Sequence, residues 1–297
     1  MSTNMLARVG VAAVAIPAIL WISYQGGLWL LGMTTLFALI GMHEFLIAEG
    51  HTPATAAYWG TFLTATMSFA VLIFGYVSLV QDGQVRAADA IGFGALWIAG
   101  AASTLVFFLF SSMLFALGRR EPRQLFEAAT RLVWGLIYIT WLYPFVFLVG
   151  TFVPTAVGPG ISGGDVLLLL FALLWVGDTA AMFVGMKFGR HKLAPAVSPN
   201  KTVEGFFGGL VGAMLVGVVL YFWRFEGTVA LLHIVAISVG CSVFGQVGDL
   251  VESMWKRSLA IKDSSSLIPG HGGVLDRFDS LLFAAPFLFA YFVLFVA

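Results

Sequence analysis

Long apolar stretches decide the fold of this chain, and the clearest is residues 166–186, VLLLLFALLWVGDTAAMFVGM. The stretch carries one charged residue, Asp178, and is long enough to cross the ~30 Å hydrocarbon layer of a bilayer as an α-helix. Membrane barrels use strands of roughly 10 residues in which apolar and polar side chains alternate, so this uninterrupted run does not fit a barrel. The stretch therefore predicts a transmembrane helix.

The composition of the whole chain agrees with this reading. Of the 297 residues, 60% are hydrophobic and 10% are charged. Soluble domains average about 45–50% apolar and about 25% charged residues, so an ordinary soluble enzyme, a disordered chain and a basic nucleic-acid-binding protein are all excluded. The net charge is zero, and Cys241 is the only cysteine, so the chain forms no internal disulfide.

Nine stretches are apolar enough, or nearly so, to form a membrane-spanning helix of about 20 residues. Most of the charge, and much of the Gly and Pro, lies between them. We therefore expect an all-α polytopic integral membrane protein with about nine transmembrane helices in a single membrane domain, residues 1–297. Spans one to five belong to residues 1–165, and spans six to nine, with the longest polar connections, belong to residues 166–297. The expected spans are residues 6–24, 28–47, 58–80, 91–117, 132–152, 166–186, 206–223, 229–248 and 281–296.

Lysine and arginine residues predict the orientation, because they gather in cytoplasmic connections. The connection at 118–131 carries four arginines. If it is cytoplasmic, alternation over nine spans places 13 of the 15 Lys and Arg on the cytoplasmic side and leaves Arg86 and Arg224 outside. We therefore expect a cytoplasmic N-terminus and an external C-terminus.

Charged residues within the apolar stretches are functional candidates, because placing them in hydrocarbon is costly. Asp178 in the sixth span is the strongest of them, and a structural hydrogen bond or buried ion pair is the alternative. For His43 and Glu44 in the second span, the structural role is favoured.

The segment 249–280 holds a dense set of polar residues. If the eighth helix continues beyond the membrane surface, four of them share one face at spacings i, i+3, i+4 and i+7. A Gly-rich run, PGHGG at 269–273, must form a loop, and Asp276 and Asp279 then lie on one side of a helix start. The alternative is a solvated loop of mixed charge. The four residues of the helix face are Asp249, Glu252, Ser253 and Lys256.

This combination suits phosphoryl or nucleotidyl transfer. Mg²⁺ is usually held by one or two carboxylates together with substrate phosphates, and Lys and Arg neutralise phosphate oxygens. Glycine-rich turns let backbone N–H groups approach an anion. The sequence contains no Walker A motif, dinucleotide-binding fingerprint, zinc-ligand cluster or Gly-x-Ser-x-Gly elbow.

A second polar cluster, SPNKTVEG at 198–205, precedes the seventh span. Pro199 disfavours helix there, so Lys201 and Thr202 are expected near the start of that helix, where an N-terminus attracts anions. A simple capping motif is the alternative.

Together these residues resemble the signature of the phosphatidate cytidylyltransferase, or CDP-diacylglycerol synthase, family. The resemblance covers roughly residues 175–285 and includes segments around Asp178, 198–205 and Asp249. The signature residues are Ser253, Lys256, Arg257, Lys262, Asp263, Pro269, His271, Gly272, Gly273, Asp276, Arg277, Phe278 and Asp279.

The resemblance implies that CTP reacts with phosphatidic acid in the bilayer to give CDP-diacylglycerol and pyrophosphate. It implies Mg²⁺ as cofactor, with a second monovalent or divalent cation left open. Asp249 and Asp276, with Asp279 as a third, become the candidate metal ligands. Lys256 and Arg257 are candidate catalytic cations that hold triphosphate or lipid phosphate, and Lys201 would do the same from the other loop.

The remaining candidate site residues are substrate contacts or neighbours of the reacting groups. Ser253, Lys262, Asp263 and His271 are assigned to substrate contact, Asp178 to the cavity wall facing the metal, and Glu204 to the orientation of Lys201.

The expected topology places the active site on the cytoplasmic side of a membrane, the inner membrane if the source is bacterial, where CTP is available. The diacyl tails then stay in the bilayer. Gly208 and Gly212 form a small-xxx-small pair that serves close helix packing within the chain or, alternatively, a homodimer.

Two other functions compete with this one. One is a related membrane enzyme, a CTP-dependent lipid kinase or a cytidylyltransferase for another lipid phosphate, and the near-complete signature over residues 253–279 argues against it. An ion-coupled transporter would use Asp178 and Asp249 as a cation path, but it would not need the cytoplasmic Gly-rich loop.

Overall fold

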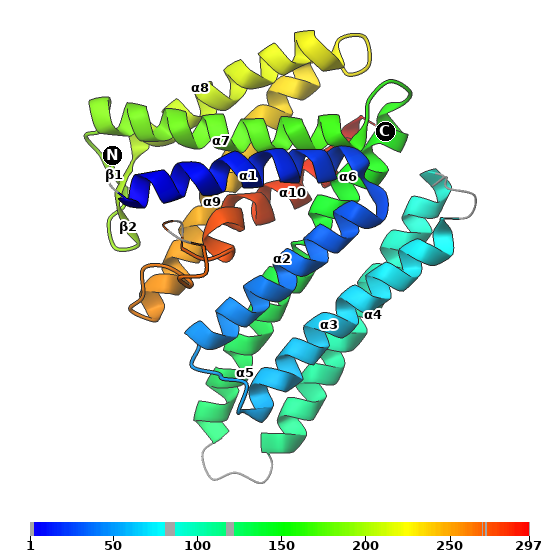
Figure 1. Ribbon diagram of the computed structural model, residues 1–297, viewed down its shortest axis with the longest axis vertical. Helices are drawn as coiled ribbons and strands as arrows, with labels where there is room; N and C mark the ends of the chain where they lie inside the picture. Colours follow the sequence, from blue (N-terminus) through cyan, green and yellow to red (C-terminus); the bar gives the residue numbers. More distant parts are fainter. Residues whose placement is uncertain (1–2, 81–86, 117–121, 269, 271, 297) are drawn as a thin grey trace. The chain divides into compact units, whose positions relative to one another are not determined.

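The computed structural model describes residues 3–80, 87–116, 122–268, 270 and 272–296. These residues form helices joined by short connections and one two-stranded sheet (Figure 1). The chain divides into two compact units, residues 31–144 and residues 1–30 with 145–297. The polar residues of the expected site that the structure describes all belong to the second of these units.

The unit of residues 31–144 is built from helices. It contains most of α2 (Gly27–Ala48), α3 (Ala56–Leu79), α4 (Ala87–Ala116), α5 (Pro122–Leu136) and the π-helical turn η1 (Ile137–Trp141). Its core includes Phe45, Phe69 and Leu72. His43 forms a 2.8 Å hydrogen bond with Tyr58, which fits the structural role favoured for it.

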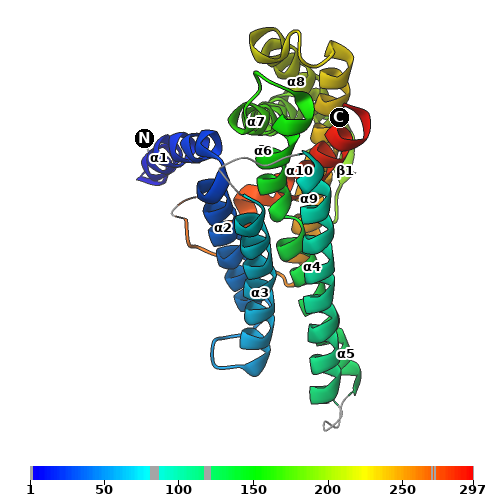
Figure 2. The ribbon, with the colours of Figure 1, turned by 90° about the vertical axis from the view of Figure 1, so that its right-hand side faces the viewer.

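The other unit carries the remaining elements. They are α1 (Thr3–Gln25), α6 (Pro144–Val157), α7 (Gly163–Phe188), β1 (Lys192–Ala194), β2 (Ser198–Thr202), α8 (Val203–Leu220), the π-helical turn η2 (Tyr221–Phe225), α9 (Leu231–Ser258) and α10 (Leu275–Phe295). Helix α7 packs against α8, and α9 packs against α10 and α8 (Figure 1). The pairing of α7 with α8 is also visible along the helix axes (Figure 2).

Glycines allow α7 and α8 to approach closely. A Cβ added at Gly208 would lie 2.5 Å from the Cβ of Val184, and one at Gly212 would lie 2.5 Å from the Cβ of Ala180. The small-xxx-small pair of α8 therefore serves helix packing within this chain, which is the first of its two expected roles.

Asp165 holds the N-terminal end of α7. Its buried carboxylate accepts hydrogen bonds from Ser162 N at 2.8 Å and from Ser162 Oγ at 2.7 Å in a capping box. Arg224 of η2 donates to the two carboxylate oxygens at 2.9 Å each, and Tyr24 of α1 donates at 3.1 Å. This network joins α1, α7 and η2 at the end of α7 farthest from the β-hairpin.

The helices confirm an all-α membrane protein. Seven helical segments of the described residues are long and apolar enough to cross a membrane, and the segments Val9–Gln25 and Trp97–Phe110 are shorter apolar helices. Each of the nine expected stretches overlaps helical structure within the described part of the chain, but the boundaries differ. The eighth expected span ends at 248 whereas α9 continues to Ser258, and the ninth begins at 281 whereas α10 begins at Leu275. Polar side chains do not interrupt backbone hydrogen bonding, so a helix can continue beyond its apolar part. Hydropathy therefore ends the eighth span too early and begins the ninth span too late.

Candidate active site

A β-hairpin between α7 and α8 carries Lys201 toward α9. Strands β1 and β2 pair antiparallel, with Lys192 opposite Thr202. Glu204 closes the base of the hairpin, because its carboxylate accepts from Arg190 N at 3.0 Å and contacts His191 Nδ1 at 2.6 Å. Thr202 Oγ1 accepts from Gly205 N and caps α8.

Lys201 and Asp249 bring the two polar segments of the sequence together. The Lys201 Nζ lies 2.7 Å from Asp249 Oδ2. Ser253, one turn farther along α9, donates to Asp249 Oδ1 at 3.2 Å. The side chains of Lys201 and Asp249 are 24% and 35% exposed, so this ion pair can be reached by a solute.

Asp178 of α7 faces the same ion pair. Its carboxylate interacts electrostatically with Asp279, Asp249 and Lys201, and the residue is exposed in the described structure. Asp178 lies about 15 Å from the end of α7 at Phe188, given a rise of about 1.5 Å per residue. We call Asp178, Lys201 and Asp249 the outer cluster.

Beside it lies an inner cluster, formed by Glu252, Lys256, Asp276 and Asp279. Lys256 Nζ is 2.6 Å from Asp276 Oδ1 and 3.3 Å from Glu252 Oε1. The side chains of Lys256, Glu252 and Asp276 are only 12%, 0% and 3% exposed. Removing Lys256 would leave two carboxylates without a counter-charge in a poorly solvated place, which is strongly destabilising.

Asp276 also holds the connection between α9 and α10. Its Oδ2 accepts from Ser264 N at 2.9 Å, Ser264 Oγ at 3.0 Å and Gly273 N at 2.8 Å. The segment from 264 to 273 is therefore fastened to the first turn of α10 by one carboxylate. Sequence reasoning placed Asp276 among the metal ligands but did not find this anchoring.

Glu252 is a residue whose role the sequence did not suggest. Both of its carboxylate oxygens are buried, and Oε1 lies 3.3 Å from the Lys256 ammonium. It interacts electrostatically with Asp279, Lys256 and Asp276. The only signal in the sequence was its spacing of three residues from Asp249 and four from Lys256, which placed it on the functional face of the helix.

The two clusters suit a hard divalent cation in their donor chemistry. Across the residues that the structure describes, no three His, Cys, Asp or Glu side chains form a metal-binding group. Asp276 is engaged by four donors, whereas Asp249 and Asp279 have fewer contacts. Mg²⁺ commonly takes one or two carboxylates and completes its shell with substrate phosphates and water, which is what this arrangement fits.

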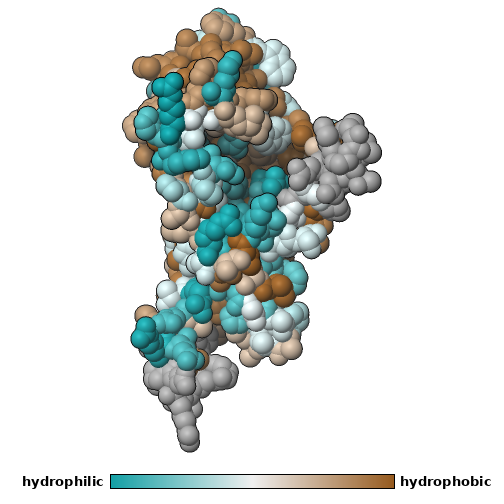
Figure 3. All heavy atoms as spheres, turned by 90° about the vertical axis from the view of Figure 1, so that its left-hand side faces the viewer, coloured by the Kyte–Doolittle hydropathy of each residue, from teal (hydrophilic) through white to brown (hydrophobic). Residues whose placement is uncertain are grey.

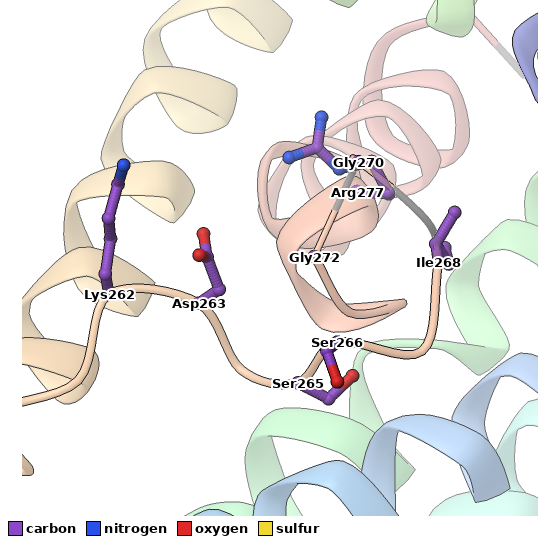
Figure 4. A pocket seen from close by; sticks show the side chains of 8 residues that line it. All are labelled: Lys262, Asp263, Ser265, Ser266, Ile268, Gly270, Gly272 and Arg277. Carbon is purple, nitrogen blue, oxygen red and sulfur yellow. The ribbon is translucent and has the colours of Figure 1, made fainter. Parts of the chain in front are cut away.

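The other expected site residues lie around the same end of α9. Arg257 donates to Val197 O at 3.3 Å and to Ile261 O at 3.0 Å, so it links the hairpin turn to the end of the helix. Lys262 and Asp263 line a cavity of about 500 Å³ (Figure 4).

His271 lies outside the described residues. A space-filling view of the molecule shows hydrophilic side chains gathered among hydrophobic ones (Figure 3).

Replacing Gly272 tests whether the anchoring by Asp276 supports the loop. Gly272 has φ +82°, and a Cβ there would lie 2.6 Å from Asp276 Oδ2. Gly227 has φ +81° with nothing within 4 Å of its Cβ position, so Gly227→Ala is a matched control for backbone strain alone. Each alanine costs roughly 1–2 kcal/mol in the left-handed region. We expect Gly272→Ala to lower the apparent melting temperature in detergent by roughly 3 °C more than Gly227→Ala does. Equal decreases would mean that the Asp276 contacts contribute nothing.

The sequence has recognisable relatives. It matches the profile of the cytidylyltransferase family over residues 6–295. A phosphatidate cytidylyltransferase of Staphylococcus haemolyticus is 50% identical over 128 residues, which are 43% of this chain and 48% of that protein. One from Staphylococcus epidermidis is 49% identical over 123 residues, 41% of this chain and 46% of the relative. The chain thus spans about half the length of the curated relatives it matches. The match over residues 6–295 shows that this chain belongs to the cytidylyltransferase family.

Proposed function

We propose that the chain is a phosphatidate cytidylyltransferase, which transfers CMP from CTP to phosphatidic acid and releases pyrophosphate. Family membership and the names of the relatives support this activity. The observation that carries it is the 2.7 Å contact between Lys201 and Asp249. It joins the two segments that separately resemble the family signature, so that carboxylates and cations meet at one place.

The chemistry needs positioning more than acid–base catalysis. In the proposed reaction a lipid phosphate oxygen attacks the α-phosphorus of CTP, and the bond to the pyrophosphate leaving group breaks. A phosphate monoester is already anionic near neutral pH, so it needs no strong base. The difficulty is to hold two polyanions together, and cations that screen their repulsion lower the barrier.

The charged residues of the two clusters have different roles in holding the two polyanionic substrates. Lys201 is partly exposed and supplies positive charge beside Asp249. Lys256 is enclosed by carboxylates, so in this arrangement it fixes Asp276 rather than offering its charge to a substrate. Asp249 and Asp279 are the carboxylates that would hold Mg²⁺, with Asp276 as the third candidate. When bound, the ion would neutralise phosphate charge and stabilise the departing pyrophosphate.

We also propose the finer topology: nine spans, a cytoplasmic N-terminus and an external C-terminus. Seven long apolar helices among the described residues support this count, and it would be reached if the two shorter apolar segments also cross the membrane. This topology places both clusters on the cytoplasmic side of the membrane, the inner membrane in a bacterium. CTP then arrives from the cytoplasm, and phosphatidic acid presents its headgroup from the bilayer.

The two rival functions leave different products. A lipid kinase would release CDP instead of pyrophosphate. A transporter would move ions without consuming CTP. The ion pair occupies the Asp249 carboxylate with a fixed cation and joins it to the second polar segment, which favours the transferase over an ion path.

Asp249→Asn tests the proposed activity. Asp249 is preferable to Asp276, because Asp276 also anchors the loop. With purified protein, phosphatidic acid, CTP and Mg²⁺, we expect pyrophosphate release by Asp249→Asn to fall by about 10²–10³-fold, the range for losing a group that stabilises transition-state charge. Glu226→Gln, an acid-to-amide change at an exposed residue after η2, should keep near-normal turnover. Normal pyrophosphate release by a folded Asp249→Asn protein would remove Asp249 from the site.

Cysteine labelling tests the topology. Cys241 is buried and is replaced by serine to give a background without thiols. In spheroplasts, a membrane-impermeant maleimide should label Ala230→Cys, in the connection before α9, but not Ala196→Cys in the hairpin turn. Permeabilisation should expose Ala196→Cys. Labelling of Ala196→Cys in sealed spheroplasts would show that the clusters face outward.

A further inference from the structure

We propose that the cavity between the α9–α10 connection and the first turn of α10 binds the phosphate chain of a nucleoside triphosphate, with Arg277 as its main anion contact. This inference rests on the proposed function and assigns that function's nucleotide to a place. The cavity has a volume of about 500 Å³, within the roughly 300–1,000 Å³ of typical small-molecule sites. Its lining residues are Lys262, Asp263, Ser265, Ser266, Ile268, Gly270, Gly272 and Arg277 (Figure 4).

The cations of this cavity are available, unlike those of the two clusters. Lys201 and Lys256 are paired with carboxylates, and Arg257 donates to backbone carbonyls. Among the described residues, neither the Lys262 ammonium nor the Arg277 guanidinium has a hydrogen-bond or ion-pair partner. An arginine beside a hollow, with no carboxylate bound to its guanidinium, is suited to bidentate binding of a phosphate.

Asp263 decides which end of the cavity takes the anion. Its side chain lies beside that of Lys262 (Figure 4), so its carboxylate opposes a phosphate at that end of the cavity. Arg277 comes from α10, and the serines of the lining offer hydroxyl donors. The phosphate chain is therefore assigned to the Arg277 end of the cavity.

The cavity adjoins the inner cluster through Gly272. A side chain at Gly272 would meet Asp276 Oδ2 at 2.6 Å and the Cβ of Asp263 at 3.5 Å. The wall of the cavity at this glycine is therefore in contact with the carboxylate that Lys256 holds. A phosphate chain lying here ends next to the proposed metal ligands, which is where the leaving pyrophosphate of CTP has to be.

The surroundings favour a nucleotide over a lipid headgroup, although both present phosphate. The lining has one aliphatic side chain, Ile268, and lies in the connection between two helices rather than along an apolar helix face. Acyl chains would find only this one aliphatic side chain in the lining. A water-soluble polyphosphate matches both the polarity and the position.

Binding of inorganic tripolyphosphate to the purified protein, without lipid, tests the site directly. We expect Arg277→Gln to weaken this binding by about 10-fold, as for the loss of a charge-assisted hydrogen-bonding group, and Arg277→Lys to weaken it less. Arg190→Gln removes an exposed arginine on the hairpin side and should leave binding unchanged. Unchanged affinity in Arg277→Gln would overturn the proposal.

Steady-state kinetics separate the two phosphate sources and the two proposals. Arg277→Gln should raise KM for CTP by about 10-fold while KM for phosphatidic acid stays constant. A rise in the phosphatidic acid KM alone would assign the cavity to the lipid headgroup and overturn the nucleotide assignment. If the unmodified protein binds tripolyphosphate through Arg277 but forms no CDP-diacylglycerol, the proposed function fails and the anion site stands. If it transfers CMP and Arg277→Gln is kinetically normal, the function stands and the anion site fails.

Discussion

The contact between Lys201 and Asp249 is the interaction on which the arrangement of the site depends. Lys201 lies on a short hairpin between α7 and α8, whereas Asp249 lies on α9, and their charged groups are 2.7 Å apart. Ion pairs this exposed add at most about 1 kcal/mol to the free energy of unfolding. The importance of this pair is therefore that it holds the two charged groups at one place. Here the pair brings a cation from one polar segment to the carboxylates of another, and Asp178 from α7 joins them.

Behind that pair, the protein keeps an ionic network out of water. Glu252, Lys256 and Asp276 are almost fully buried, which is expensive unless the charges are matched. The structure meets part of this requirement by giving Asp276 three further donors from the α9–α10 connection. The hydrogen bonds that stabilise the Asp276 carboxylate thus also hold the α9–α10 connection in place. This connection and Arg277 together line the cavity. The excess of acidic groups around a single lysine is consistent with a site that receives a divalent cation.

Hydropathy predicted the positions of the helices well, because apolar runs such as 166–186 have no alternative to crossing a bilayer as helices. It did not predict the helix ends at Ser258 and Leu275, the hairpin of β1 and β2, or the π-helical turn within the fifth expected span, which depend on local hydrogen bonding. The spacing of Asp249, Ser253 and Lys256 correctly indicated one helix face. The approach of Lys201, the anchoring by Asp276 and the burial of Glu252 arise from tertiary packing, which no local pattern in one sequence reports.

A double-mutant cycle on turnover measures the central contact most directly. Lys201→Met, Asp249→Asn and the variant with both changes are compared by kcat/KM for CTP-dependent pyrophosphate release. Residues that act as one unit are not additive, so the double variant should be no worse than the more damaged single variant, within about threefold. If the two losses instead multiply, Lys201 and Asp249 act independently, and the meeting of the two polar segments is not what creates the site.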